Sequence, residues 1–184
     1  MKLVNIPISY NSNCYCFHKW LGGLIEKKQD NYEIEEPWRN NKKFRHVYEQ
    51  ILDPYLLSQQ TIPCNIPHYS KTAVLYAKIL IRLCKQSFLI AVLFSKLNLL
   101  RFENAKEAVM VFRDIFPKQE QKNLCLPRSL FVASSSKAFK KSGVLFIGVF
   151  LPSRNMHAWI IENNENPDIS DEIWICYQPV LAII

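Results

Sequence analysis

The sequence predicts an α+β fold in which helices pack on a small antiparallel sheet, with an accessory region at the N-terminus. Apolar residues recur at helical spacing through much of residues 72–141, whereas residues 144–177 alternate β-branched and aromatic runs with turns. Helices followed by strands in separate blocks are typical of the α+β class. The chain has 184 residues, of which 49% are apolar and only four are glycine, so a core without disulfides is expected and glycine-rich folds are excluded.

Residues 1–70 form the first predicted unit. Short extended segments before residue 25 are separated by Pro7, by Asn11 to Asn13 and by Gly22–Gly23, which favour turns. Apolar residues at helical spacing predict a helix over residues 44–57. The segment from Thr61 to Pro67 contains two prolines and predicts a connector, so we expect a domain boundary near residue 70.

Residues 71–184 form the second predicted unit, which begins with helices and ends with strands. Residues 72–97 predict one long helix or a helix pair, and residues 102–115 predict another helix, which Pro117 ends. A further helix is expected from about Cys125 to Lys141, with Pro127 in its first turn and Gly143 after its end. Three strands are expected after it, over residues 144–151, 156–161 and 172–177.

The charge of the chain is concentrated in its middle. The net charge is +7, and residues 73–141 carry thirteen lysines and arginines against four acidic residues. These cations are expected on the solvated faces of helices, because aromatic residues do not interleave with them on one face as they would in a nucleic-acid-binding surface. The most apolar run, from Ser87 to Phe94, is bounded by Lys85 and Lys96 and is too short for a membrane span of about 20 residues.

The cysteines favour free thiols in a reducing cytoplasm. No apolar signal segment opens the chain, and the six cysteines are Cys14, Cys16, Cys64, Cys84, Cys125 and Cys176. Cys14, Cys16 and His18 alternate and would share one face of a strand, where Cys64 and His68 could join them around zinc. The spacing fits no standard zinc motif, so no metal site is expected.

Two residues in the second unit can form a nucleophilic pair. His157 lies 32 residues after Cys125, with one predicted helix and one predicted strand between them. A cysteine at a helix N-terminus has its pKa lowered by the helix dipole, and an adjacent imidazole completes an ion pair that can attack a carbonyl. The backbone N–H of Cys125 is then a candidate oxyanion donor, and Gln119 or Gln121 is a candidate second donor. The alternative is a small buried thiol and a core histidine.

A string of motifs around these residues resembles one enzyme family. Cys125-Leu-Pro-Arg-Ser-Leu130, Gly143, Leu145-Phe-Ile-Gly-Val149 and His157-Ala-Trp-Ile160 resemble the B proteins of lasso-peptide biosynthesis, over roughly residues 75–162. The resemblance implies a transglutaminase-like, papain-like core with Cys125 as nucleophile and His157 as general base and acid. It also implies removal of the leader from a ribosomally made precursor peptide, ATP-dependent proteolysis, and a partner cyclase that closes the macrolactam ring. The cleavage chemistry itself requires no cofactor.

The family's third catalytic residue is an aspartate at a position that Tyr177 occupies here, before Gln178 and Pro179. Asp171 is our first candidate to orient the imidazole in its place. Gln178 is a second, through its amide oxygen, and Asp168 lies in the same loop. Loss of the third residue, with weakened activity, is the remaining alternative.

The resemblance also bears on Arg128 and on the N-terminal unit. Arg128 lies one turn after Cys125 and is expected to contact substrate, to cap the helix surface or to pair with a carboxylate. Fused members of the family carry a winged-helix leader-recognition domain where residues 1–70 lie here, the alternative being a helical extension that shields the core. The expected function is leader removal by a cytoplasmic cysteine peptidase. The alternative is an inactive module that binds the precursor and delivers it to the cyclase.

Overall fold

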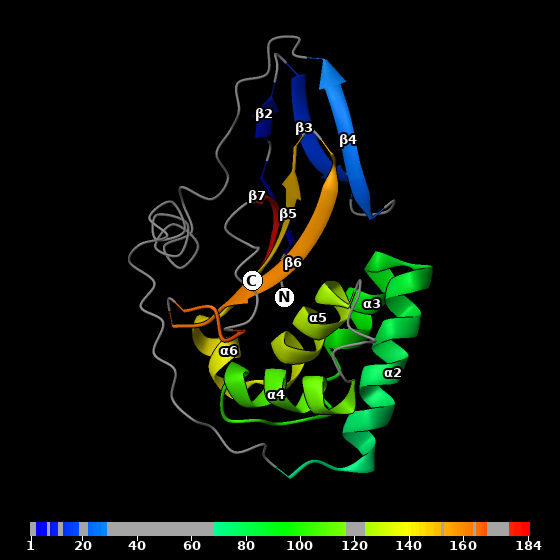
Figure 1. The fold of residues 1–184 in the computed structure, drawn as a ribbon, viewed down its shortest axis with the longest axis vertical. Coiled ribbons are helices and arrows are strands. Elements are labelled where there is room, and N and C mark those ends of the chain that lie inside the picture. Colours follow the sequence, from blue (N-terminus) through cyan, green and yellow to red (C-terminus); the bar gives the residue numbers. More distant parts are fainter. Residues whose placement is uncertain are drawn as a thin grey trace.

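The chain folds into mixed α+β structure, as predicted (Figure 1). The computed structural model describes residues 3–6, 8–10, 13–18, 22–28, 68–116, 124–151, 153–163, 165–168 and 177–184. The helices are α2 (Lys71–Gln86), α3 (Phe88–Ser95), α4 (Ala105–Ile115), α5 (Cys125–Ser135) and α6 (Lys137–Ser142). The strands are β1 (Leu3–Asn5), β2 (Ile8–Tyr10), β3 (Asn13–His18), β4 (Gly23–Lys28), β5 (Val144–Phe150), β6 (Asn155–Ile161) and β7 (Gln178–Ile183).

The larger sheet is antiparallel and has the strand order β1-β7-β5-β6. Its β5–β6 hairpin confirms the two strands predicted there, and it pairs Gly148 with His157. The third predicted strand is not confirmed, because residues 172–176 lie outside the described residues and Tyr177 is a bend. The strand on the other side of β5 from β6 is β7. Pro179 obscured it in the sequence, since proline is uncommon inside a sheet, and here it lies opposite Gly148 at a register shift.

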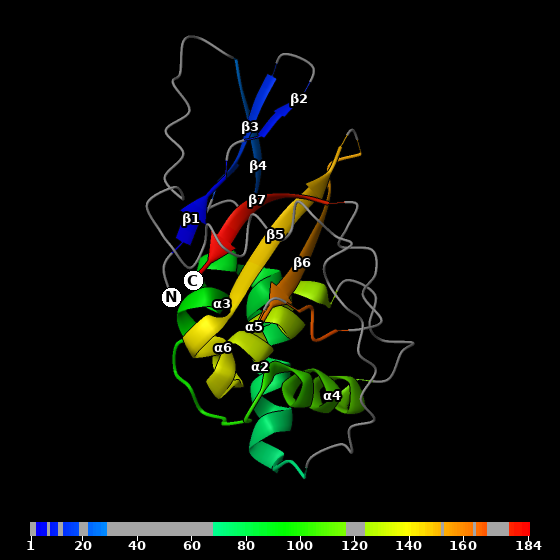
Figure 2. The same cartoon turned by 90° about the vertical axis from the view of Figure 1, so that its left-hand side faces the viewer.

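The N-terminal segment contributes to both sheets. β1 pairs with β7, with Leu3 opposite Ile183, so the first described strand belongs to the sheet of the second predicted unit. β2, β3 and β4 form a separate three-stranded antiparallel sheet, at the end of the molecule away from α4 (Figure 2). Phe17 of β3 packs edge-on against Phe88 of α3, with ring centroids 5.0 Å apart. The predicted helix at 44–57 and the connector after it lie outside the described residues.

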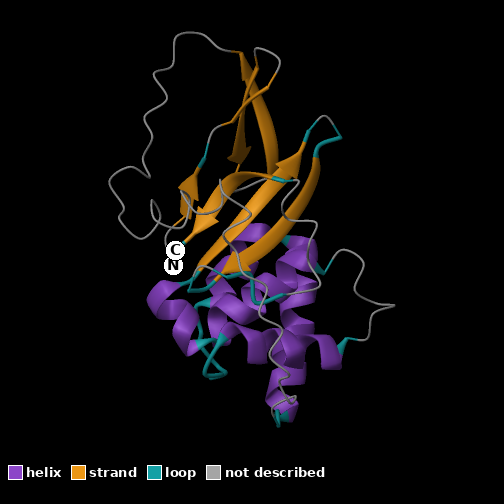
Figure 3. Ribbon diagram, turned by 60° about the vertical axis from the view of Figure 1, so that its left-hand side comes forward, coloured by secondary structure: helices purple, strands orange, loops and turns teal. Residues whose placement is uncertain are grey.

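The two faces of the larger sheet bury different clusters. On one face Leu145, Ile147 and Val149 join the main core with the helices, which gather on one side of the sheet (Figure 3). On the other face lies a smaller cluster, formed by Val4, Ile6, Val144, Phe146, Trp159, Ile161 and Ala182. β5 is therefore apolar at nearly every position, unlike a strand with one solvated face.

Serine residues divide the helices. Ser87 is extended and separates α2 from α3, which confirms the predicted pair, and its hydroxyl accepts a hydrogen bond from the N–H of Ile90. Ser136 is also extended and separates α5 from α6, so the single helix expected to Lys141 is wrong. The Ser136 hydroxyl accepts from the N–H of Phe139, which starts the new helix. Within the described residues no helix is long and apolar enough to cross a membrane.

A buried glutamate holds the end of β6 against two helices. The Glu162 carboxylate accepts the N–H of Ala105 at the start of α4 (3.0 Å) and the hydroxyl of Ser136 between α5 and α6 (2.8 Å). A carboxylate at a helix N-terminus is stabilised by the free N–H groups and the dipole. Glu162 therefore fixes where α5 ends relative to the sheet.

Candidate active site

The candidate nucleophile lies at the first residue of α5. Leu124 precedes the helix with a non-helical backbone, and its carbonyl accepts the N–H of Arg128 at 2.9 Å. Leucine cannot cap a helix with its side chain, so the first N–H groups of α5 are not satisfied by such a cap. The placement of Cys125 at a helix N-terminus with Pro127 in the first turn confirms the sequence prediction.

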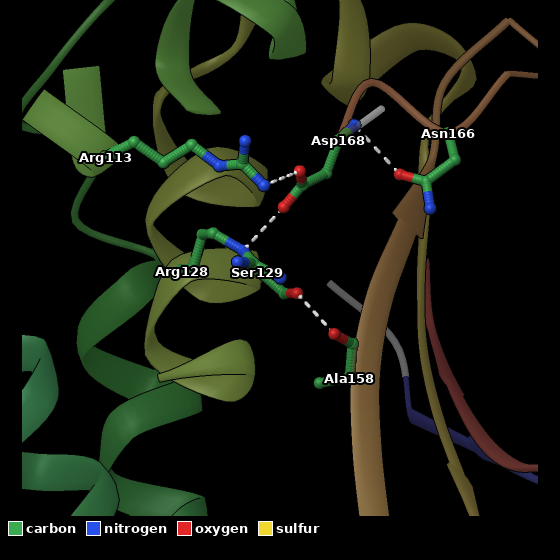
Figure 4. A network of polar contacts seen from close by, with 6 residues as sticks. All are labelled: Arg113, Arg128, Ser129, Ala158, Asn166 and Asp168. Atoms are coloured by element: carbon green, nitrogen blue, oxygen red, sulfur yellow. Dashed lines mark hydrogen bonds and ion pairs between the residues drawn. The ribbon is translucent and has the colours of Figure 1, made fainter. Parts of the chain in front are cut away.

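α5 is docked against the edge of the sheet through the backbone of one residue. Among the strands that the structure describes, β6 pairs with β5 alone and so lies at the edge of the sheet. The hydroxyl of Ser129 donates to the carbonyl of Ala158 at 3.1 Å (Figure 4), and the backbone of Ala158 hydrogen-bonds the Cys125 sulfur. Ser129 is buried, so this bond also satisfies its hydroxyl. The first turn of α5 thus forms hydrogen bonds with the backbone of Ala158, the residue after His157.

The structure brings Cys125 and His157 together. Burial raises the pKa of the Cys125 thiol, but the hydrogen bond and charge of His157, the backbone of Ala158 and the charge of Arg128 outweigh burial. The net pKa of Cys125 is below its ordinary value, so this thiol ionises at a lower pH than an ordinary cysteine does. An imidazole that hydrogen-bonds a thiolate is the arrangement required of a nucleophile and its base.

A second thiol lies within electrostatic range of the first and behaves differently. Cys84, near the end of α2, packs against the same apolar core as Cys125. Burial and the adjacent negative charge of Cys125 raise the pKa of Cys84 to about 12. Cys84 therefore remains a thiol under conditions in which Cys125 ionises, and it serves as an internal reference for reactivity.

The imidazole of His157 lies between two aromatic rings. Its centroid is 5.1 Å from that of Tyr177 and 6.2 Å from that of Trp159, which is nearly parallel to it. Gly148, opposite His157, makes room for Trp159, because a Cβ there would lie 2.6 Å from the indole and 2.9 Å from the Gln178 carbonyl. Tyr177 contacts His157 through its ring.

Asp168 pairs with two arginines. The carboxylate contacts Arg113 of α4, and its other oxygen lies 2.9 Å from Nε of Arg128 (Figure 4). Its side chain is only 5% exposed, and the Asn166 side chain accepts its backbone N–H. Of the three expectations for Arg128, pairing with a carboxylate is the one found. Asp168 thus holds α4 and α5 beside the loop after β6, a structural role that its position in a polar loop sequence did not indicate.

Other predicted site residues have different outcomes. Gln178 is the first residue of β7 and is exposed. Asp171, Gln119 and Gln121 lie outside the described residues, so their roles stay predictions. Cys14, Cys16 and His18 share β3 while Cys64 also lies outside, and the part of the chain that is described contains no cluster of metal-ligating residues.

The two thiols are expected to alkylate at different rates. At pH 7, iodoacetamide should modify Cys125 much faster than Cys84, because only the pKa of Cys125 is lowered. His157→Ala should slow the modification of Cys125, since it removes the hydrogen bond and the charge that favour the thiolate. Peptide mass spectrometry over time measures both sites in one sample. Equal rates at Cys84 and Cys125, or no effect of His157→Ala, would contradict the proposed ion pair.

Asp168→Asn is expected to destabilise the fold. It leaves two arginines near a buried position without their carboxylate, and breaking such a pair costs about 3–5 kcal/mol of unfolding free energy. The matched control is Glu103→Gln, which breaks the exposed pair with Lys137 and should cost less than about 1 kcal/mol. Urea unfolding measures both variants, and equal small losses would show that Asp168 does not hold the helices together.

Comparisons with family models, curated proteins and solved structures found no significant match to this chain. The likeness to lasso-peptide B proteins therefore rests on the residues quoted from the sequence. What the fold adds is the meeting of Cys125 and His157, from α5 and β6, with the thiol pKa lowered.

Proposed function

We propose that this chain is a cysteine peptidase that removes the leader from the ribosomally made precursor of a lasso peptide, with a transglutaminase-like core. The observation that carries the proposal is the hydrogen bond between His157 and a Cys125 whose pKa is lowered at a helix N-terminus. The order of elements agrees with it, since the nucleophile opens α5 and the base follows on β6. The substrate class, a lasso-peptide precursor, comes from the resemblance of the motif string between Cys125 and Ile160 to the B proteins.

The chemistry follows from the groups at the site. The Cys125 thiolate attacks the scissile carbonyl, and the N–H of Cys125 donates to the developing oxyanion. The His157 imidazolium gives its proton to the leaving amine, which releases the mature part of the peptide and leaves the leader as a thioester. The neutral imidazole then takes a proton from water, whose attack on the thioester frees the leader and the thiolate.

The N-terminal unit is proposed to capture the leader. β2 and β4 are the two edge strands of the separate small sheet, and an extended peptide can add to such an edge through main-chain hydrogen bonds. Phe17 and the cation–π contact of Arg154 with Tyr15 connect this sheet to α3 and to the β5–β6 turn. A leader bound there would lie on the same molecule as the nucleophile.

The ATP dependence and the cyclase partner remain proposals from the resemblance. The sequence has four glycines, Gly22, Gly23, Gly143 and Gly148, and so lacks the glycine-rich loop with which many proteins hold triphosphates. None of the steps assigned to Cys125 and His157 uses a nucleotide. A second candidate function, an inactive module that delivers the precursor to the cyclase, is favoured by Tyr177 alone.

Cys125→Ser is expected to abolish leader removal. Serine keeps the size of the side chain but is not ionised at neutral pH, so the fold should persist while the nucleophile is lost. Cys84→Ser is the matched control and should cleave within about threefold of the parent. Mass spectrometry of precursor incubated with the chain, cyclase and ATP measures the product. Cleavage by Cys125→Ser at the parent rate would remove the peptidase assignment from this residue.

The third catalytic residue is tested by a set of substitutions. If Asp171 orients His157, Asp171→Asn should lower turnover strongly, by up to about 10⁴-fold in an ordered triad, and Gln178→Ala should be nearly silent. The reverse pattern would assign the role to Gln178. If both variants stay within about threefold of the parent, the enzyme works as a Cys125–His157 dyad. A gain of activity in Tyr177→Asp would show that the chain is a weakened peptidase.

A further inference from the structure

The helical hairpin of α2 and α3 has an unusual charge composition. Residues 71–102 contain six basic residues and no aspartate or glutamate. On α2, Lys71, Lys78, Arg82 and Lys85 are all exposed and recur at helical spacing. A solvated helix that only needs to be soluble normally mixes both signs of charge, so this surface attracts anions as a whole.

The outer side of α3 and the segment that follows it add exposed apolar side chains to this basic hairpin, Ile90 and Leu93 on the helix and Leu97 and Leu99 after it. Ile90, Leu93 and Leu97 follow one another at spacings of three and four residues, and with Leu99 they are 51–56% exposed. The inward-facing residues of α3, including Phe88, Ala91 and Val92, are already buried in the core. α3 is therefore apolar on all sides although one side is solvated, which marks an interaction surface.

Cations gather where this apolar stripe ends. Lys96 and Lys140 line a cavity of about 330 Å³ with Asn98, and its apolar lining includes Ala133, Phe139 and Ile184. Burial lowers the pKa of Lys140, and the positive charge of Arg101 nearby lowers it further. Among the described residues no aspartate or glutamate forms an ion pair with Lys96, Arg101 or Lys140. A group of cations that pairs with no described aspartate or glutamate, beside exposed leucines, fits a phosphate joined to an apolar body.

We propose that the α2–α3 hairpin binds the surface of a membrane that contains anionic phospholipid. Ile90, Leu93, Leu97 and Leu99 would enter the interface, and Lys96, Arg101 and Lys140 would hold headgroup phosphates. Apolar residues flanked by cations are the features by which surface helices bind anionic bilayers without spanning them. A second copy of this chain docked through the same hairpin fits poorly, because two basic surfaces without aspartate or glutamate would repel each other.

The binding surface leaves the candidate active site accessible. Cys125 opens α5, whereas Ala133 of the cavity lies eight residues further along the same helix, about 12 Å away. α2 and α3 lie at one side of the helical layer, and the small sheet lies at the other end of the molecule from α4 (Figures 1 and 2). The proposal does not depend on the peptidase function, which the membrane assay below does not measure.

Co-sedimentation of the full chain with lipid vesicles tests the proposal. The chain should pellet with vesicles of phosphatidylglycerol and phosphatidylcholine, remain in solution with phosphatidylcholine alone, and be released by salt. Leu93→Gln with Leu97→Gln should weaken binding roughly fivefold or more, and Lys96→Glu roughly tenfold or more. The matched control, Lys137→Glu, changes the charge equally on α6 outside the cluster and should bind within about twofold of the parent. Circular dichroism confirms that each variant is folded.

Four results would overturn the proposal. The first is a parent chain that stays in solution with phosphatidylglycerol vesicles, and the second is equal binding by Lys96→Glu and Lys137→Glu. The third is binding to polyglutamate without binding to vesicles, which would assign the surface to an acidic protein. Folded leucine variants that bind as tightly as the parent would also contradict it, because the apolar stripe would then have no role.

Discussion

The docking of α5 on the edge of β6 is the contact on which the site depends. Ser129 and Cys125 both bond the backbone of Ala158, the residue after His157, so the helix cannot slide along the strand without losing both bonds. An edge strand normally has to protect its unpaired backbone groups, and here a helix does so. The same two bonds hold the N-terminus of α5 close to the imidazole of His157. The hydrogen bond and charge of that imidazole help to lower the pKa of Cys125.

Two buried carboxylates keep that docking in register. Glu162 bonds the start of α4 and Ser136 beyond α5, while Asp168 pairs with Arg113 of α4 and Arg128 of α5. Buried ion pairs contribute little net stability but are costly to break, so they specify one arrangement of helices. Arg128 also links this support to the chemistry, because its charge helps to lower the pKa of Cys125.

Local pattern predicted most of the second unit but not its long-range polar contacts. The helices, the β5–β6 hairpin and the positions of Cys125 and His157 followed from periodicity, proline placement and β-branched runs. β7 was missed because its second residue is Pro179, which is uncommon inside a sheet. α5 was predicted too long because the break at Ser136 depends on the hydrogen bonds of its hydroxyl with Glu162 and with the N–H of Phe139. Asp168 looked like a loop residue, since no local signal shows that two arginines 55 and 40 positions earlier will meet it. The pairing of β1 with β7 of the second unit was missed for the same reason, because no local signal shows it.

The central claim is that Cys125 ionises as a pair with His157, and the ultraviolet absorbance of its thiolate measures this most directly. The difference between the parent chain and Cys125→Ser, recorded against pH, isolates this one thiol. The account predicts a thiolate signal whose midpoint lies below pH 8.5, about the pKa of an ordinary cysteine, and moves to higher pH in His157→Ala. A difference signal that appears only at or above the ordinary pKa, and is unchanged in His157→Ala, would contradict it.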